Sequence, residues 1–175
     1  MRVLLVLLAV LVPLSASAQK KKAATSPAKG PPCSASAYRQ FDFWLGDWEV
    51  QTPKGTPAGE NKVEKILEGC ALRETWTGVD GSHGSSLTSY DGPGNRWTQT
   101  FVDDLGMVLV LDGDFRDGKM TLSGRRSASR GSTMLNRITW QKMEGDRIRQ
   151  RWEQSADDGK NWTLLFEGIY SRKKE

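Results

Sequence analysis

The sequence contains few of the side chains that metal binding and nucleophilic catalysis require. Its 175 residues include one histidine, His83, and two cysteines, Cys33 and Cys70. These three residues cannot supply a four-ligand zinc site, and no serine lies in a GxSxG nucleophile elbow. Most paired aspartates sit beside glycines, where Asp typically stabilises a turn. The sequence therefore favours a protein without enzymatic activity, although an enzyme using carboxylates within the strands stays an open hypothesis.

An excess of positive charge is also absent from most of the chain. Five of the 25 basic residues precede Cys33, whereas all 21 acidic residues follow it. From Cys33 onward the net charge is therefore −1. A nucleic-acid binder typically carries a basic patch and a high isoelectric point, so we expect no nucleic-acid partner.

Long hydrophobic runs are missing after residue 14. The apolar residues 3–14 follow Arg2 and precede Ala16-Ser17-Ala18, which is the three-part pattern of a secretory signal. The run is shorter than the roughly 20 residues that a spanning helix needs. We expect a signal peptide at 1–18, a flexible Lys- and Pro-rich linker at 19–32 and one domain at 33–175. The mature protein would be secreted, into the periplasm, without a transmembrane segment.

Only one disulfide is possible in an exported chain with two cysteines. Disulfides persist in oxidising compartments, and the sequence thus predicts a Cys33–Cys70 bond. The bond would tie the start of the domain to its body and stabilise it by roughly 3–4 kcal/mol in the loop-entropy model.

Turn signals recur along the domain and separate short segments rich in Val, Ile, Thr, Trp and Phe. In the segment 147–154, for example, Ile148, Gln150 and Trp152 alternate with three arginines, as in a strand with two different faces. The spacing predicts an all-β fold, a single antiparallel up-and-down β-barrel of about ten strands. The expected strands are 44–51, 62–68, 71–77, 85–90, 96–103, 107–112, 119–124, 133–143, 147–154 and 162–172. A short helical segment at 36–44 precedes them.

Seven tryptophans are the strongest anomaly in the composition. Most would fill the core, but rings and amides alternate along neighbouring strands, and a small-ligand pocket combines apolar walls with a few polar groups. The residues expected to line such a cavity are Trp76, Tyr90, Gln99, Trp140, Gln150 and Trp152.

Among the glutamates inside expected strands, those that could matter to a cavity are Glu74, Glu153 and Glu167. A glutamate that faces the barrel interior needs an arginine or a ligand to compensate its burial. The arginines that could supply that charge are Arg73, Arg149 and Arg151.

The stretch FDFWLGDWEV at 41–50 contains the Gly46-Asp47-Trp48 triplet, which looks like the GxW signature of lipocalins and other calycin barrels. Together with Glu68-Gly69-Cys70, the segment 137–140 and the segment 168–172, it resembles a family of secreted bacterial calycin-like domains of unknown function, distantly similar to nitrobindin-type barrels. The resemblance covers residues 33–173.

This resemblance implies a barrel with one closed end. Trp48 would lie across that end, with Arg172 packed on its ring, and Gly46 would end the short helix. The aromatic residues that would dock the helix against the barrel are Phe41, Phe43 and Trp44.

The leading functional hypothesis is non-covalent binding of a small apolar or amphipathic molecule inside the barrel, with no cofactor. One alternative is haem or another tetrapyrrole bound through His83, although nitrobindin-type barrels bind haem through a histidine late in the chain and this sequence has none after His83. Another is an envelope protein-interaction module with a filled barrel and an exposed face carrying Arg147, Arg149 and Arg151. The sequence leaves the oligomeric state open.

Overall fold

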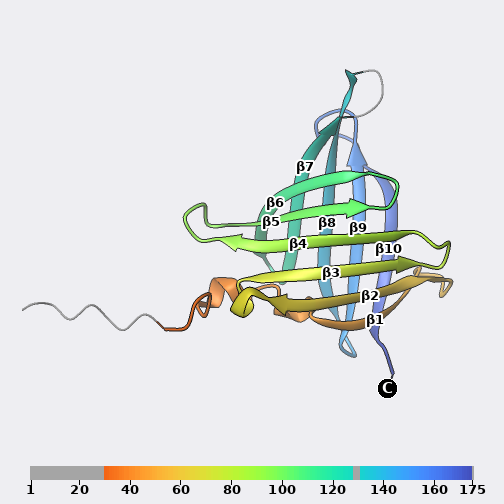
Figure 1. Ribbon diagram of the computed structural model, residues 1–175. Helices are drawn as coiled ribbons and strands as arrows, with labels where there is room; N and C mark the ends of the chain where they lie inside the picture. Colours follow the sequence, from red (N-terminus) through yellow and green to blue (C-terminus); the bar gives the residue numbers. More distant parts are fainter. Residues whose placement is uncertain (1–29, 128–130, 175) are drawn as a thin grey trace, which may run out of the picture.

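The chain folds into a closed antiparallel barrel of ten strands in the order β1-β10-β9-β8-β7-β6-β5-β4-β3-β2 (Figure 1). The structure is a computed structural model that describes residues 30–127 and 131–174. The strands are β1 Gly46–Gln51, β2 Pro57–Ile66, β3 Ala71–Gly78, β4 His83–Asp91, β5 Arg96–Asp103, β6 Val108–Arg116, β7 Lys119–Ser127, β8 Thr133–Met143, β9 Arg147–Ser155 and β10 Thr163–Arg172. The predicted up-and-down barrel is confirmed. The predicted signal peptide at 1–18 and most of the predicted linker at 19–32 lie outside the described residues.

Alternation of side chains along each strand builds the barrel. In β9, the side chains of Ile148 and Gln150 are buried in the lumen, whereas that of Arg147, the first residue of the strand, is exposed. Successive side chains of a strand point to opposite faces. Pairing of β1 with β10 closes the sheet, from Trp48 opposite Arg172 to Gln51 opposite Ile169. Closure leaves none of these ten strands with an unpaired edge.

β2 and β10 differ in kind from the sequence prediction, while β6 and β7 end four and three residues later than expected, at Arg116 and Ser127. The β2 strand begins at Pro57, five residues earlier than expected, because Gly59 pairs with both Val50 and Gly78 despite its turn-like sequence context. The β10 strand contains a bulge between Leu164 and Phe166. Strict alternation along 162–172 would place Trp162 and Phe166, four residues apart, on the same face. The extra residue reverses the inward and outward alternation, so the two rings lie on opposite faces.

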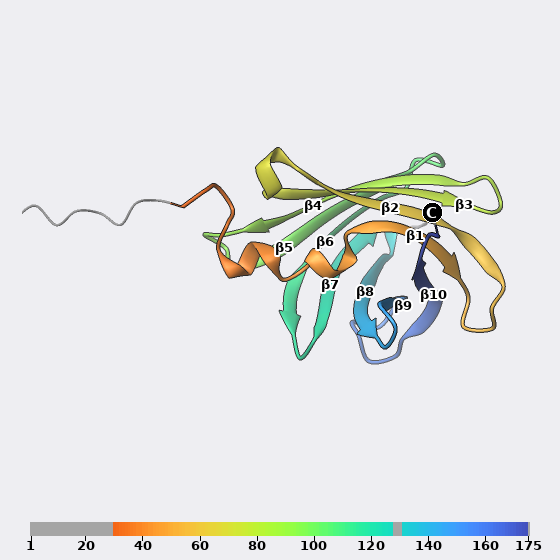
Figure 2. The ribbon, with the colours of Figure 1, turned by 90° about the horizontal axis from the view of Figure 1, so that it is seen from below.

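Two short 3-10 helices, η1 Ser36–Arg39 and η2 Asp42–Trp44, plug one end of the barrel. Figure 2 shows this segment, in orange, running across that end. Phe41 and Trp44 are fully buried and stack with their ring centroids 4.8 Å apart. Phe41 also makes a T-shaped contact with Trp140, which lies inside the barrel, with 5.1 Å between the ring centroids. Phe43 is only partly buried.

Trp48 lies beneath the plug and is covered by Arg172. The Arg172 guanidinium carbon is 3.9 Å from the centre of the Trp48 ring, a cation–π contact. The indole Nε1 donates to the Trp44 carbonyl at 3.0 Å, and Arg172 Nη1 donates to the Leu45 carbonyl at 2.5 Å. A Cβ on Gly46 would lie 1.8 Å from Arg172 Nη1, so glycine is needed for this close approach.

The Cys33–Cys70 disulfide joins the plug segment to the turn before β3. Arg39 reinforces the same link, because its Nη2 donates to the Cys33 carbonyl at 3.0 Å and to the Gly69 carbonyl at 2.7 Å. The disulfide and these two hydrogen bonds tie the plug to the turn before β3, in addition to the packing of its buried rings and its hydrogen bonds from Trp97 and Lys65.

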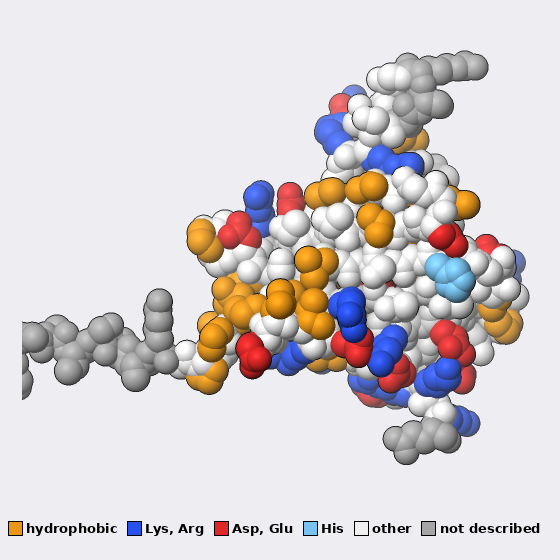
Figure 3. All heavy atoms as spheres, viewed as in Figure 1, with side chains coloured by type: hydrophobic (Ala, Val, Ile, Leu, Met, Phe, Trp, Pro, Cys, Tyr) orange, Lys and Arg blue, Asp and Glu red, His pale blue; other side chains and the backbone are white. Residues whose placement is uncertain are grey.

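The outer surface over β4–β6 carries a cluster of exposed hydrophobic side chains, visible in orange in Figure 3. Its members on the strands are Leu87, Val102, Val108 and Val110. No helix in residues 30–127 and 131–174 is long and apolar enough to cross a membrane.

Candidate functional site

A cavity of about 170 Å³ occupies the lumen between the plug and the opposite end of the barrel. Its lining comes from β3, β5, β6, β8, β9 and β10. The lining residues are Glu74, Trp76, Gln99, Phe101, Leu109, Ile138, Trp140, Gln150, Trp152, Phe166 and Tyr170.

Burial distinguishes a floor from a mouth in this cavity. Trp140, Gln99 and Tyr170 are almost fully buried, and Trp140 is the lining residue that contacts the plug. The partly exposed rings lie farther along their strands, away from the plug: Trp76, Phe101, Trp152 and Phe166. A ligand would therefore enter past aromatic rings and meet polar groups below them.

The structure brings together five of the six residues that the sequence analysis placed in a cavity. The exception is Tyr90, which is the last inward-facing residue of β4 and lies at the plugged end. Its ring contacts Tyr38 at 5.1 Å and Trp97 at 5.7 Å between centroids, and its hydroxyl donates to Asn95 Oδ1. Alternation places Tyr90 on the inner face, but it does not specify the height at which a tilted strand presents each side chain.

The sequence analysis did not assign six of the lining residues: Glu74, Phe101, Leu109, Ile138, Phe166 and Tyr170. Three of them had a usable signal, because Phe101 is two residues after Gln99, Ile138 is two residues before Trp140 and Glu74 is two residues before Trp76. Residues two apart on a strand share a face. Leu109, in contrast, lies on a strand to which no cavity residue had been assigned.

Of Glu74, Glu153 and Glu167, only Glu74 faces the lumen. Its Oε1 accepts a hydrogen bond from Asn61 Nδ2 at 2.8 Å, and its Oε2 accepts one from the Ser86 hydroxyl at 2.6 Å. Burial raises the pKa of Glu74, and the bonds from Ser86 and Asn61 offset this only in part. The side chain is 5 % exposed, so its remaining contact with solvent is through the cavity.

Two further hydrogen-bonded groups complete the polar floor. Gln99 Nε2 donates to the Ser86 and Thr88 hydroxyls at 3.2 and 3.1 Å. Tyr170 donates its hydroxyl proton to Gln150 Oε1. Burial, together with the nearby Glu74 carboxyl, raises the pKa of Tyr170 far above its usual range, so the phenol stays neutral.

Glycines leave room for three of the rings at the mouth, two of them on the neighbouring strand and Gly168 on the same strand as its ring. A Cβ on Gly59 would lie 2.7 Å from the Trp76 ring, and one on Gly84 would lie 2.3 Å from Phe101. Gly168 stands in the same relation to Phe166, at 2.9 Å. Glycine in a strand commonly marks such a close approach. The positions of these rings, and hence the width of the mouth, therefore depend on glycine having no side chain at positions 59, 84 and 168.

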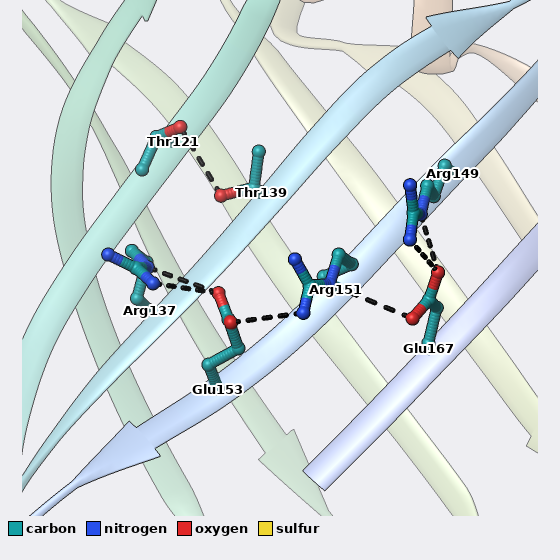
Figure 4. Close-up of polar contacts among 7 residues, drawn as sticks. All are labelled: Thr121, Arg137, Thr139, Arg149, Arg151, Glu153 and Glu167. Carbon is teal, nitrogen blue, oxygen red and sulfur yellow. Dashed lines mark hydrogen bonds and ion pairs between the residues drawn. The ribbon is translucent and has the colours of Figure 1, made fainter. Parts of the chain in front are cut away.

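Glu153 and Glu167 point away from the lumen, into an ion-pair network on the outer face of β8–β10 (Figure 4). Glu153 accepts from Arg137 at 2.9 Å and pairs with Arg151 at 3.2 Å. Glu167 accepts from Arg149 at 2.5 Å and lies 3.7 Å from Arg151. The arginines that the sequence offered as partners for a lumen glutamate therefore compensate the outer pair instead.

Of the three arginines expected on an exposed face of β9, two take part in this network. Arg149 and Arg151 are half-buried and held by carboxylates, and only Arg147 is mainly exposed, with its Nε donating to the Glu144 carbonyl at 3.1 Å. Arg73 lies on the outer face too, 2.8 Å from Glu64.

His83 lies outside the cavity. It is the first residue of β4, its side chain is exposed, and its inward-facing neighbour Gly84 packs against Phe101. In residues 30–127 and 131–174, no group of three His, Cys, Asp or Glu residues is arranged to hold a metal ion. A tetrapyrrole in the lumen would have no histidine ligand there, and a cavity of about 170 Å³ is below the roughly 300 Å³ at which sites for drug-sized molecules begin.

Comparisons with known proteins found no match from which a function could be transferred. No family model matches the sequence, and no curated protein matches it. The closed ten-stranded barrel agrees with a calycin-like architecture, whereas membership of the family with the FDFWLGDW motif stays a prediction.

Proposed function

We propose that this protein binds a small apolar or amphipathic molecule non-covalently in its barrel cavity. The supporting observation is a lumen whose walls are mainly aromatic and whose floor carries hydrogen-bonding groups. Ligand sites in proteins typically combine apolar walls with a few placed polar groups. The short η1–η2 plug leaves the far end for entry.

The size of the cavity limits the ligand. An engineered apolar cavity of about 150 Å³ binds benzene, so a cavity of about 170 Å³ fits a molecule with one ring and a short substituent. Each 100 Å² of apolar ligand surface that is removed from water contributes about 2.5 kcal/mol. The floor amides of Gln99 and Gln150 would orient the polar end of the molecule.

A matched pair of variants tests this proposal. Leu109→Trp fills the cavity from β6, whereas Val110→Trp places the same ring on the outer face of the same strand, where Val110 is half-exposed. Calorimetric titration with benzyl alcohol as probe should show binding to the wild type and to Val110→Trp, and none to Leu109→Trp. Circular dichroism verifies that both variants retain the barrel.

Native mass spectrometry of the protein purified from its source gives an independent measurement. A bound molecule small enough for the cavity is expected. A wild-type protein that carries no molecule and also fails to bind benzyl alcohol would contradict the proposal.

We also infer that the protein acts outside the cytoplasm as a calycin-like secreted protein. The Cys33–Cys70 disulfide supports an oxidising compartment, and the contact of Arg172 with Trp48 supports the resemblance to calycins. Mass spectrometry of the exported protein should find Gln19 as the first residue. A full-length chain retained in the cytoplasm would contradict this inference.

A further inference from the structure

Glu74 is a feature of the cavity that an apolar ligand leaves unexplained. Among residues 30–127 and 131–174 it is the only acidic residue in the lining, and none of these lining residues is a lysine, arginine or histidine. The other titratable group in this described lining is Tyr170, which is neutral and hydrogen-bonded to Gln150. A buried carboxyl without a cation is costly when ionised.

Two hydrogen bonds compensate the burial of this carboxyl in part. One Glu74 oxygen accepts from Asn61 on β2, and the other accepts from Ser86 on β4. Ser86 is held in turn by the amide of Gln99 on β5. Burial still raises the pKa of Glu74, so a positively charged partner is needed to favour the carboxylate.

The rings above Glu74 suit the same partner. Trp76 is two residues from Glu74 on β3 and Trp152 lies at the mouth on β9, while Trp140 lines the floor from β8. The faces of such rings attract cations, most strongly those of tryptophan. A positively charged group that enters past the mouth would meet aromatic faces first and the carboxylate at the floor.

We propose that the cavity selects a ligand that carries a protonated amine on a small, mainly apolar body, with Glu74 as its counter-ion. This inference rests on the proposed function and specifies the chemical class of the ligand. The ammonium group would donate to the remaining acceptor positions of the carboxylate, while the apolar body occupies the space between the mouth rings.

Binding of such an amine should release a proton. Burial raises the pKa of Glu74 in the empty cavity, so the carboxyl retains its proton above the usual titration range of a glutamate. An ammonium ion that enters favours the carboxylate, and the carboxyl proton passes to the buffer. The charge balances, because one positive charge enters the cavity as one proton leaves it.

The test compares benzylamine, which is protonated at neutral pH, with benzyl alcohol, which has nearly the same shape and no charge. Calorimetric titrations use the wild type, Glu74→Gln and the control Glu64→Gln. Glu64 lies on the outer face of β2 in a partly exposed pair with Arg73, so its substitution removes the same charge away from the lumen.

The wild type and Glu64→Gln should bind benzylamine about tenfold or more tightly than benzyl alcohol, as expected for a charge-assisted hydrogen bond. In Glu74→Gln the preference should disappear while benzyl alcohol binding persists. Titrations in buffers of different ionisation enthalpy between pH 5 and 8 should show proton release by the wild type, which keeps the test valid if Glu74→Gln fails to fold.

The possible failures can be told apart. Equal binding of the two probes, or an amine preference that survives in Glu74→Gln, would refute the role of Glu74 and leave the ligand-binding cavity intact. Absence of proton release at every pH would also count against it. If neither probe binds the wild type, both the inference and the proposed function fail.

Discussion

The disulfide that anchors the plug gives a quantitative prediction. Cys33 and Cys70 are separated by 37 residues, and a loop of this length corresponds to about 4 kcal/mol of stabilisation in the loop-entropy model. The closed loop contains the plug helices η1 and η2, the short 3-10 helix η3 Leu67–Gly69, β1 and β2. The variant with both cysteines replaced by serine should therefore lose about 4 kcal/mol of unfolding free energy, and its Tm should fall by roughly 10 °C.

Arg39 should make this loss depend on a second interaction. It bridges the same two segments through the carbonyls of Cys33 and Gly69, and its hydrogen bonds form more easily when the disulfide already holds those segments together. In a double-mutant cycle, Arg39→Met and the serine double variant should be non-additive by about 0.5–3 kcal/mol. Arg147→Met is the matched control, because Arg147 also donates to a backbone carbonyl, at 3.1 Å, but in a distant turn.

Urea unfolding followed by tryptophan fluorescence measures both effects, since Trp44 and Trp48 lie at the plug. The m value shows whether the denatured state has also changed. A loss below about 1 kcal/mol in the serine variant would refute the reasoning, because it would mean that the plug segment is held by packing alone. Strict additivity with Arg39→Met would refute the shared link.

Two further predictions concern the cavity. Because burial raises the pKa of Glu74, the folded state binds more protons than the unfolded state above about pH 4.5, so this group makes the protein less stable as pH rises, by at most about 1.4 kcal/mol per unit. Glu74→Gln should remove that decline, and the difference in urea midpoint from the wild type should grow between pH 5 and 8; a constant difference would contradict it. Gly84→Ala places a methyl group 2.3 Å from the Phe101 ring. The variant should lose about 1–3 kcal/mol of unfolding free energy through overpacking and bind benzyl alcohol more weakly. An unchanged stability would show that the ring moves freely.

Much of the fold follows from local sequence patterns. β5, β8 and β9 begin where the turn signals and the alternation place them, at Arg96, Thr133 and Arg147. The exceptions have physical causes. Residues 57–61 contain Pro and Gly and were interpreted as a turn, but Gly59 leaves room for the Trp76 ring on the neighbouring strand, an interaction that no local pattern records.

The bulge in β10 shows a second limit. Strict alternation placed Trp162 on the same face as Phe166, whereas the extra residue between Leu164 and Phe166 reverses the phase. Trp162 then lies under Arg137 on the outer face, 3.8 Å from the guanidinium carbon. A bulge is favoured by pairing with the adjacent strand, so it cannot be located from one strand alone.

The sequence by itself determined the strand periodicity, which depends on local spacing, and the disulfide partners, because it has only two cysteines, while the resemblance to calycin barrels predicted the aromatic plug. Only the tertiary structure decided which face of each strand closes around the lumen. Alternation places Glu74 on the face of Trp76 and Glu153 on the face opposite Trp152, but it does not show which face points inward. Closure of the barrel and the register between strands bury Glu74 beside Asn61 and Ser86 and pair Glu153 and Glu167 with arginines outside. That choice defines the chemistry of the cavity, since the direction of a side chain relative to a closed sheet is a property of all ten strands together.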